Sequence, residues 1–200
     1  MPGLGPFSSP LWVGLCALLL ALLLGAGALR LRARRAHRRS FARLSLRLGL
    51  QLRAGGRDAH GMVAGRELAI WAEDAQGSRL TCVRVELADV FPGGESVSAE
   101  LLEAWAAAAP DTRASAGPAA LGARVAQLLE EARVQALLLA FQRANLRTWI
   151  EAGQLHAQRD GRSQEQVRLL EAFVVEALSL AVALSAAVHG PQQPQRERTG

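Results

Sequence analysis

The stretch "RLTCVRVEL", residues 79–87, decides how most of the chain folds. Apolar or β-branched side chains recur at every second position, with cysteine, arginine and glutamate between them. A period of two is typical of a β-strand with one buried face. We therefore predict a strand here. One side is formed by Thr81, Val83, Val85 and Leu87, and the other side by Cys82, Arg84 and Glu86.

Two further strands are predicted before this one. Residues 41–53, "FARLSLRLGLQLR", carry leucine at every second position from 44 to 52. In residues 65–73, "GRELAIWAE", Leu68, Ile70 and Ala72 share a face. The connections, residues 54–61 and 73–78, are short and contain glycine and polar residues, so the three strands predict an antiparallel meander.

Helices and a hairpin are predicted after the meander. Ser98 is a candidate N-cap for a helix over residues 98–109, and apolar residues at three- and four-residue spacing predict a second helix over 120–142. Residues 145–161 alternate as a hairpin that bends at Ala152 and Gly153. The pattern predicts an α+β fold in which about three helices cover one face of the sheet.

The end of this domain also carries signals. Ser163 and Gln166 have the spacing of a capping box for the last helix, and Gly190 with the proline after it is a stop signal. Residues 110–119 predict a surface linker, and residues 191–200 predict a disordered tail.

The last helix raises the question of a membrane span, because residues 169–188 are largely apolar. Glu171 and Glu176 interrupt this stretch, and each would cost about 2–3 kcal/mol near the centre of a bilayer. We favour an amphipathic helix that packs on the core.

A stronger candidate for a span is the uncharged run "LWVGLCALLLALLLGAGAL", residues 11–29. As a helix its 19 residues cover about 28 Å, close to the roughly 30 Å of a hydrocarbon core. A cleavable signal peptide is the alternative, but residues 1–10 lack the basic side chains that precede such a segment. We predict an uncleaved transmembrane helix.

Arginines crowd the segment directly behind this run. Residues 1–40 contain no acidic side chain, and the remaining residues carry 17 arginines against all 18 acidic groups, so the excess charge lies in this segment. Basic flanks stay on the cytoplasmic side of a membrane, which places the N-terminus outside and the C-terminal domain in the cytoplasm. The arginines expected at the membrane interface are Arg30, Arg32, Arg34, Arg35, Arg38 and Arg39.

The predicted organisation is a short polar leader (1–10), a transmembrane helix (11–29), a basic juxtamembrane segment (30–40), an α+β cytoplasmic domain (41–190) and the tail (191–200). This order, the Gly65–Arg66 step into a strand and the "RVEL" at residues 84–87 resemble uncharacterised single-span membrane-anchored proteins of GC-rich bacteria. The resemblance implies a single-pass bacterial membrane protein and supplies no catalytic residue.

The sequence predicts no catalytic, cofactor-binding or metal-binding residue. The four histidines lack a ligand partner at metal-binding spacing, and there is no phosphate loop, nucleophile elbow or Cys-x-x-Cys. The cysteines, Cys16 and Cys82, suit an apolar run and a strand rather than a disulfide. Asp58 and His60 share a glycine-rich loop that can hold an acid–base pair, although a plain connection is the interpretation we favour.

The leading hypothesis is a membrane-tethered, non-catalytic interaction or scaffold module, whose partners are the lipid bilayer and a protein. One alternative is an enzyme whose site is assembled from distant residues, and a pocket lined by Asp58 or His60 would favour it. The other is nucleic-acid binding through the arginine run. The membrane segment directly before the run and the absence of interleaved aromatic residues argue against that alternative.

Overall fold

The computed structural model describes residues 10–53, 55–75, 78–108, 123–161 and 166–189. The predicted linker at residues 110–119, the tail at 191–200 and Ser163 of the capping box lie outside the described residues. Most of the predicted leader lies outside them as well.

A six-stranded sheet forms the centre of the domain, with strand order β1-β2-β3-β4-β6-β5 and every neighbouring pair antiparallel. A meander of β2, β3 and β4 joins the predicted hairpin in this sheet because β4 pairs with β6. The strands are β1 (Gln51–Leu52), β2 (Asp58–Val63), β3 (Arg66–Ala75), β4 (Ser78–Glu86), β5 (Arg147–Glu151) and β6 (Gln154–Asp160).

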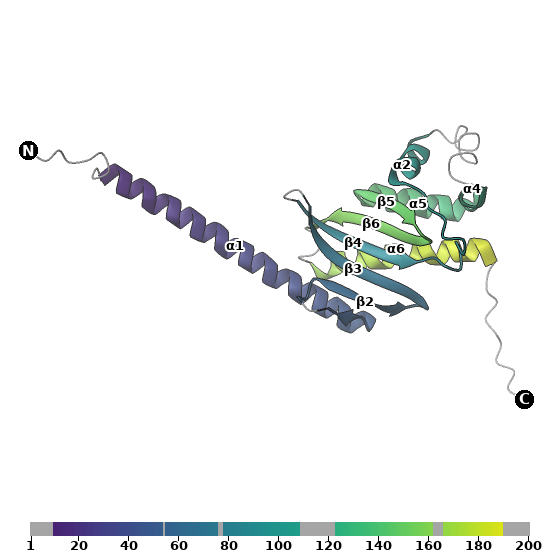
Figure 1. Cartoon of the computed structure of the whole chain (residues 1–200), viewed down its shortest axis with the longest axis horizontal. Helices are drawn as coiled ribbons and strands as arrows, with labels where there is room; N and C mark the ends of the chain where they lie inside the picture. Colours follow the sequence, from purple (N-terminus) through teal and green to yellow (C-terminus); the bar gives the residue numbers. More distant parts are fainter. Residues whose placement is uncertain (1–9, 54, 76–77, 109–122, 162–165, 190–200) are drawn as a thin grey trace, which may run out of the picture.

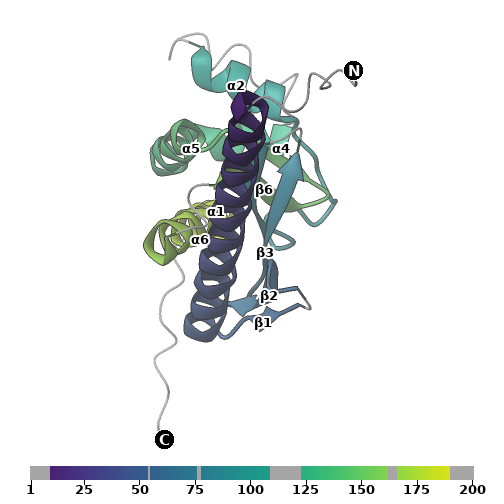
Figure 2. The same ribbon diagram turned by 90° about the vertical axis from the view of Figure 1, so that its left-hand side faces the viewer.

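The helices lie mainly on one side of this sheet (Figures 1 and 2). The last turns of α1 contact α6 and the first two strands, α5 lies beside α6, and α2 packs on β5. The first part of α1 projects away from the domain (Figure 1). The described helices are α1 (Pro10–Leu48), α2 (Ala99–Ala107), α4 (Ala123–Glu130), α5 (Ala132–Ala144) and α6 (Val167–His189).

Several sequence predictions are confirmed by these elements. The strands expected over residues 65–73 and 79–87 are β3 and β4, and the hairpin is β5 and β6. Its turn residues, Ala152 and Gly153, both have a positive φ, as the tight turn of a hairpin requires. Ser98 is the N-cap of α2, and its hydroxyl accepts a hydrogen bond from the Leu101 amide.

The strand predicted over residues 41–53 is wrong for most of its length, because α1 continues to Leu48. In a strand Leu44 and Leu46 would share a buried face. In the helix Leu44 is fully buried with Phe41, three residues before it, whereas Leu46 is 85% exposed. The three-residue spacing of the buried positions fits a helix as well as the alternation fits a strand.

Two local factors favour the helix. A helix that already runs through more than thirty residues extends without a new nucleation step. It ends at Gly49, whose φ of 67° is left-handed, and the Leu50 amide donates to the Ser45 carbonyl at 2.9 Å. This is the Schellman arrangement, which glycine adopts without strain.

The loop predicted over residues 54–61 is also wrong in part, because Asp58 and His60 lie in strand β2. This strand pairs with β3 along its whole length and with β1 at its start. Only one of its residues, Ala59, is buried, so it lacks the run of large apolar side chains that marks a strand in a sequence.

The helix predicted over residues 120–142 is two helices that meet at Glu131, which has an extended backbone. The buried residues of α4 include Leu128 and Leu129, and α5 begins its buried face at Val134. A continuous helix would turn Val134 about 140° away from Leu129, since each residue adds about 100°. The break at Glu131 brings both apolar faces to one core.

By length and hydropathy, α6 is the one helix among the described residues that is long and apolar enough to cross a membrane. The most apolar window of α6 has a mean hydropathy of 1.9, and 44% of it is buried inside the protein. The apolar part of α1 with described side chains, Gly14–Leu29, is shorter. Length and composition are weak evidence for a span in α6, because the core helix of a globular domain has the same properties.

The contacts of α6 are those of a core helix. Phe173 is fully buried and stacks on Phe141 of α5, with 6.3 Å between the ring centroids. Arg159 of β6 lies over the same Phe173 ring and pairs with Glu176 of α6. The buried residues of α6 are Leu170, Phe173, Val174, Ala177, Leu180, Ala181, Ala183 and Leu184.

The helical end of α1 leads to a stability prediction. Leu44→Ala removes a fully buried side chain and should lower the free energy of unfolding by about 2–5 kcal/mol. Leu46→Ala, at a position 85% exposed, should change it by about 0.5 kcal/mol or less. Denaturant unfolding of the full chain in detergent measures both. Equal effects of the two substitutions would support the strand instead.

Candidate functional site

The face of the sheet turned away from α5 and α6, called here the open face, carries the first candidate site. One row of paired residues crosses it from β2 to β5. The row is half-buried, and it contains aromatic, cationic and small side chains. Its members are His60, Ala69, Arg84, His156 and Trp149.

Two stacked aromatic rings lie on the open face near its β5 edge. Trp149 stacks on His156, with 5.0 Å between centroids and 17° between planes, and its indole N–H donates to Glu151 at 3.2 Å. Burial lowers the pKa of His156, Glu151 raises it in part, and Arg84 lowers it further. His156 is therefore neutral at pH 7 and acts as a flat, uncharged surface.

A pocket of about 320 Å³ lies at the other end of the open face, and both Asp58 and His60 line it. They stand two residues apart on β2, so their side chains point to the same side of the sheet. Space exists here because Ala69, which pairs with His60, has a small side chain. The pocket also contains Trp71 and Arg84.

This pocket brings together residues that the sequence separates. Among the described residues, Nδ1 of His60 is buried without a hydrogen-bond partner. Arg84 pairs with Glu67 at 3.4 Å on the pocket wall. An imidazole, a carboxylate, a guanidinium and an indole that line one pocket can bind a small polar ligand. The alternative of a site assembled from residues distant in sequence therefore has a location in the structure.

Cys82, also on the open face of β4, is unsuited to nucleophilic chemistry. Its side chain is fully buried opposite Trp71 in the register. Burial, a hydrogen bond with Glu73 and the negative charge of Glu73 together raise the pKa of the thiol to about 12. The protonated thiol is a poor nucleophile and a poor metal ligand.

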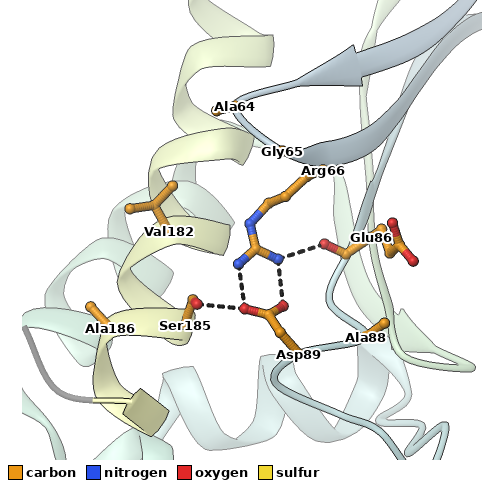
Figure 3. A pocket seen from close by; sticks show the side chains of 9 residues that line it. All are labelled: Ala64, Gly65, Arg66, Glu86, Ala88, Asp89, Val182, Ser185 and Ala186. Atoms are coloured by element: carbon orange, nitrogen blue, oxygen red, sulfur yellow. Dashed lines mark hydrogen bonds and ion pairs between the residues drawn. The ribbon is translucent and has the colours of Figure 1, made fainter. Parts of the chain in front are cut away.

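A second polar cluster lies where the β2–β3 hairpin meets α6, beside a surface pocket of about 560 Å³ (Figure 3). Arg66 is 11% exposed and forms two hydrogen bonds with the Asp89 carboxylate, at 2.7 and 2.6 Å. It also donates to the Glu86 carbonyl at 2.9 Å, and the Ser185 hydroxyl of α6 donates to Asp89. These four residues form the Arg66 clamp.

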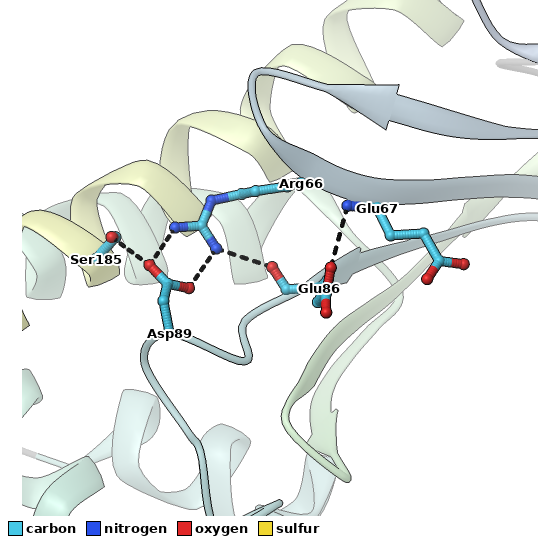
Figure 4. A network of polar contacts seen from close by, with 5 residues as sticks. All are labelled: Arg66, Glu67, Glu86, Asp89 and Ser185. Atoms are coloured by element: carbon cyan, nitrogen blue, oxygen red, sulfur yellow. Dashed lines mark hydrogen bonds and ion pairs between the residues drawn. The ribbon is translucent and has the colours of Figure 1, made fainter.

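The Arg66 clamp ties three segments together (Figure 4). Arg66 begins β3 directly after Ala64 and Gly65, whose positive φ angles form the hairpin turn. Asp89 follows β4, and Ser185 lies near the end of α6. The clamp therefore holds the end of α6 against the start of β3 and the segment that follows β4.

The charges of the clamp argue against catalysis there. Hydrogen bonds from Arg66 and Ser185, together with the charge of Arg66, hold the pKa of Asp89 at about 2. A carboxylate this acidic is a weak base at neutral pH, and Ser185 uses its proton to bond Asp89. The clamp holds the fold together.

The six arginines predicted at the membrane interface all lie on α1. The side chains of Arg32, Arg35, Arg38 and Arg39 are exposed, and those of Arg30 and Arg34 lie outside the described side chains. Arg38 is close to the domain, because its Cγ lies 3.4 Å from the position that a Cβ on Gly56 would occupy.

The chain has no match among known protein families, curated proteins or solved structures. The resemblance to single-span bacterial proteins stays a prediction. No group of three His, Cys, Asp or Glu side chains within the described part of the chain is placed to hold a metal ion.

Trp105 lies in the core, whereas Trp71 and Trp149 are half-buried on the open face. Glu171 and Glu176 are paired with Arg47 and Arg159. The Arg66 clamp was not anticipated, although a glycine with an arginine directly behind it at the start of a strand was a visible signal.

The Arg66 clamp predicts a pH-dependent stability. The folded-state pKa of Asp89, about 2, lies below its ordinary 3.8, so the stabilisation is complete above about pH 4 and is lost as the pH falls toward 2. Because Asp89 is 37% exposed, solvent screening reduces the effect to about 1 kcal/mol. Asp89→Asn should therefore lower the free energy of unfolding at pH 7 by about that amount.

Denaturant unfolding of wild type and variant between pH 2 and 7 measures the effect, and the two curves should converge at the acid end. Asp74→Asn is the matched control, since Asp74 pairs with Arg57 at 3.1 Å but is 57% exposed. The control should cost about 0.5 kcal/mol or less. A difference between wild type and Asp89→Asn that persists unchanged at pH 2 would show that the carboxylate charge is not responsible.

Proposed function

We propose that the protein is a membrane-tethered interaction module: α1 spans a bilayer and holds the domain at its cytoplasmic surface, where the open face binds a partner protein. The support comes from the surroundings of α1 and from the composition of the open face.

The observation that carries the tether is the exposure of the leucines along the first part of α1. These residues form an apolar surface on all sides of the helix, and they are 52–70% exposed. Leaving six such side chains in water forgoes on the order of 10 kcal/mol, which is comparable with the stability of a whole domain. The six are Leu18, Leu19, Leu20, Leu22, Leu23 and Leu24.

A bilayer is the surrounding that suits this helix. The run of 19 uncharged residues has the length of a hydrocarbon core, and the arginines begin directly behind it. The positive-inside rule then places the domain in the cytoplasm and the N-terminus outside.

The open face suits a protein partner. Its half-buried aromatic and arginine side chains include Trp71, Trp149 and Arg84, residue types that are enriched where protein interfaces are strongest. Met62, also on the outward side of β2, is 62% exposed. Since the helices cover the other face, a partner can bind here without displacing any described element.

Site-directed crosslinking in membranes tests the proposal. A photoreactive residue at Met62 should give a discrete adduct with a partner protein, and the same residue at Arg133, exposed on α5, should not. A reporter that is active only in the cytoplasm, fused after Gly200, should be active in the same cells. Identical adducts from both positions, or a silent reporter in cells that contain the fusion, would contradict the proposal.

The pocket beside Asp58 and His60 favours a second candidate, a small polar ligand that the domain binds or converts. His60→Gln and Asp58→Asn should then abolish the thermal stabilisation that a ligand library gives the full chain. Trp149→Phe, at the other end of the open face, should leave it intact. A library that stabilises neither wild type nor control, or stabilises all variants equally, would leave the interaction module as the better account.

A further inference from the structure

A groove of about 760 Å³ lies between the second half of α1 and the start of α6. Every charged side chain among the described residues that line it is an arginine. Three of them are Arg39, Arg43 and Arg47 on α1, and the fourth is Arg168 on α6. Only Arg39 belongs to the juxtamembrane run that the sequence singles out.

The positive charge of this groove is largely unbalanced. Arg47 pairs with Glu171 of α6. Arg39, Arg43 and Arg168 are exposed and form no ion pair within the described part of the chain. The three arginines of α1 are spaced by four residues, so they share one helix face and repel one another. An anion in the groove would relieve this repulsion.

The start of α6 adds to the same field. The Leu169 and Leu170 amides both donate to the Gln166 carbonyl at 3.1 Å, which marks the first turn of a 23-residue helix. The first amides of such a helix lack an internal acceptor, and its dipole is positive at this end. Gln166 and Arg168 both line the groove, so the helix terminus opens onto the arginines.

The groove lies close to the bilayer if α1 spans it. Ala36, the first residue of α1 that lines the groove, follows the end of the apolar run at Leu29 by seven residues, or about 10 Å of helix. A headgroup layer is about 5–8 Å deep, so the near end of the groove, at Ala36, lies within about 5 Å of it. Arg39 and Arg43 follow Leu29 by about 15 and 21 Å of helix, and a tilt of α1 toward the groove brings them closer to the headgroups.

We propose that this groove binds the phosphate of an anionic lipid headgroup. Arg39 and Arg43 of α1 and Arg168 of α6 hold the phosphate beside the N-terminal end of α6. The inference rests on the proposed function, because only a chain anchored in the bilayer brings the groove to the headgroups. It adds a lipid specificity that a tether alone does not have. It also provides a direct contact between the bilayer lipids and the domain.

Lipid retention tests the proposal. The full chain is reconstituted into phosphatidylcholine bilayers that contain a minority of phosphatidylglycerol, then transferred to mild detergent, and the retained lipids are counted by mass spectrometry. Wild type should be enriched in phosphatidylglycerol. Arg43→Gln and Arg168→Gln should each lower the enrichment about fivefold, the expected share of one arginine near an anionic surface.

Arg133→Gln is the matched control, because Arg133 is an exposed arginine on α5 and does not line the groove. It should retain phosphatidylglycerol as wild type does. The substituted arginines of the groove are exposed and unpaired, so thermal unfolding should show that all variants remain folded. Equal retention by wild type and both groove variants would overturn the inference.

A second arm distinguishes a headgroup from a free anion. Inorganic phosphate is titrated by calorimetry into the full chain in pure phosphatidylcholine bilayers. Phosphate binding that Arg43→Gln abolishes, without any enrichment of phosphatidylglycerol, would show that the groove takes a soluble anion and would overturn the lipid assignment.

Alkaline extraction of the same bilayers separates this inference from the proposed function. If alkali removes the chain from the bilayer, the proposed membrane anchoring by α1 is wrong, and the lipid site that rests on it is wrong as well. If the chain stays embedded but retains no excess of phosphatidylglycerol, the lipid site alone is wrong.

Discussion

The burial of Phe41 and Leu44 at the end of α1 determines how the rest of the molecule is arranged. Both side chains are fully buried in the core, where the last turns of α1 contact α6 and the first two strands. The apolar part of α1 belongs to the same uninterrupted helix. Because a helix transmits direction along its length, this one contact sets the orientation of the domain relative to the apolar run.

This constraint also gives the arginines an ordered arrangement. Arginines in an irregular linker would sample many positions, whereas those on α1 are presented at fixed intervals along a helix. Arg39 and Arg43 face a groove toward α6, and Arg38 lies against Gly56 of the domain. The basic segment is therefore both a topology signal and part of a surface with a defined shape.

Much of the fold could be predicted from the sequence wherever one periodicity dominated. The alternation in β4 and the hairpin of β5 and β6 placed those strands correctly, since each has a buried and an outward side. Residues 41–48 could not be assigned in this way, because their leucines fit both periods and the deciding Schellman bond at Gly49 depends on the helix before it. Strand β2 has too few large apolar residues to be recognised in the sequence, and its pairing with β3 stabilises it as a strand.

The candidate sites could be predicted less well, because strand pairing and helix packing assemble them from distant segments. Asp58 and His60 were visible as neighbours, but their pocket depends on Ala69, Trp71 and Arg84, which reach it through the register of β3 and β4. The groove likewise depends on α6 meeting α1.

The two sites lie on opposite layers of the domain, and this separation has a functional consequence under the proposed tether. The groove belongs to the helix layer, so engagement with the bilayer uses α1 and α6 and leaves the open face uncovered. The Arg66 clamp holds the C-terminal part of α6 to β3, and the N-terminal part of α6 lines the groove. Arg66 begins β3, whose outward side belongs to the open face, so α6 connects the groove to the sheet that carries the open face.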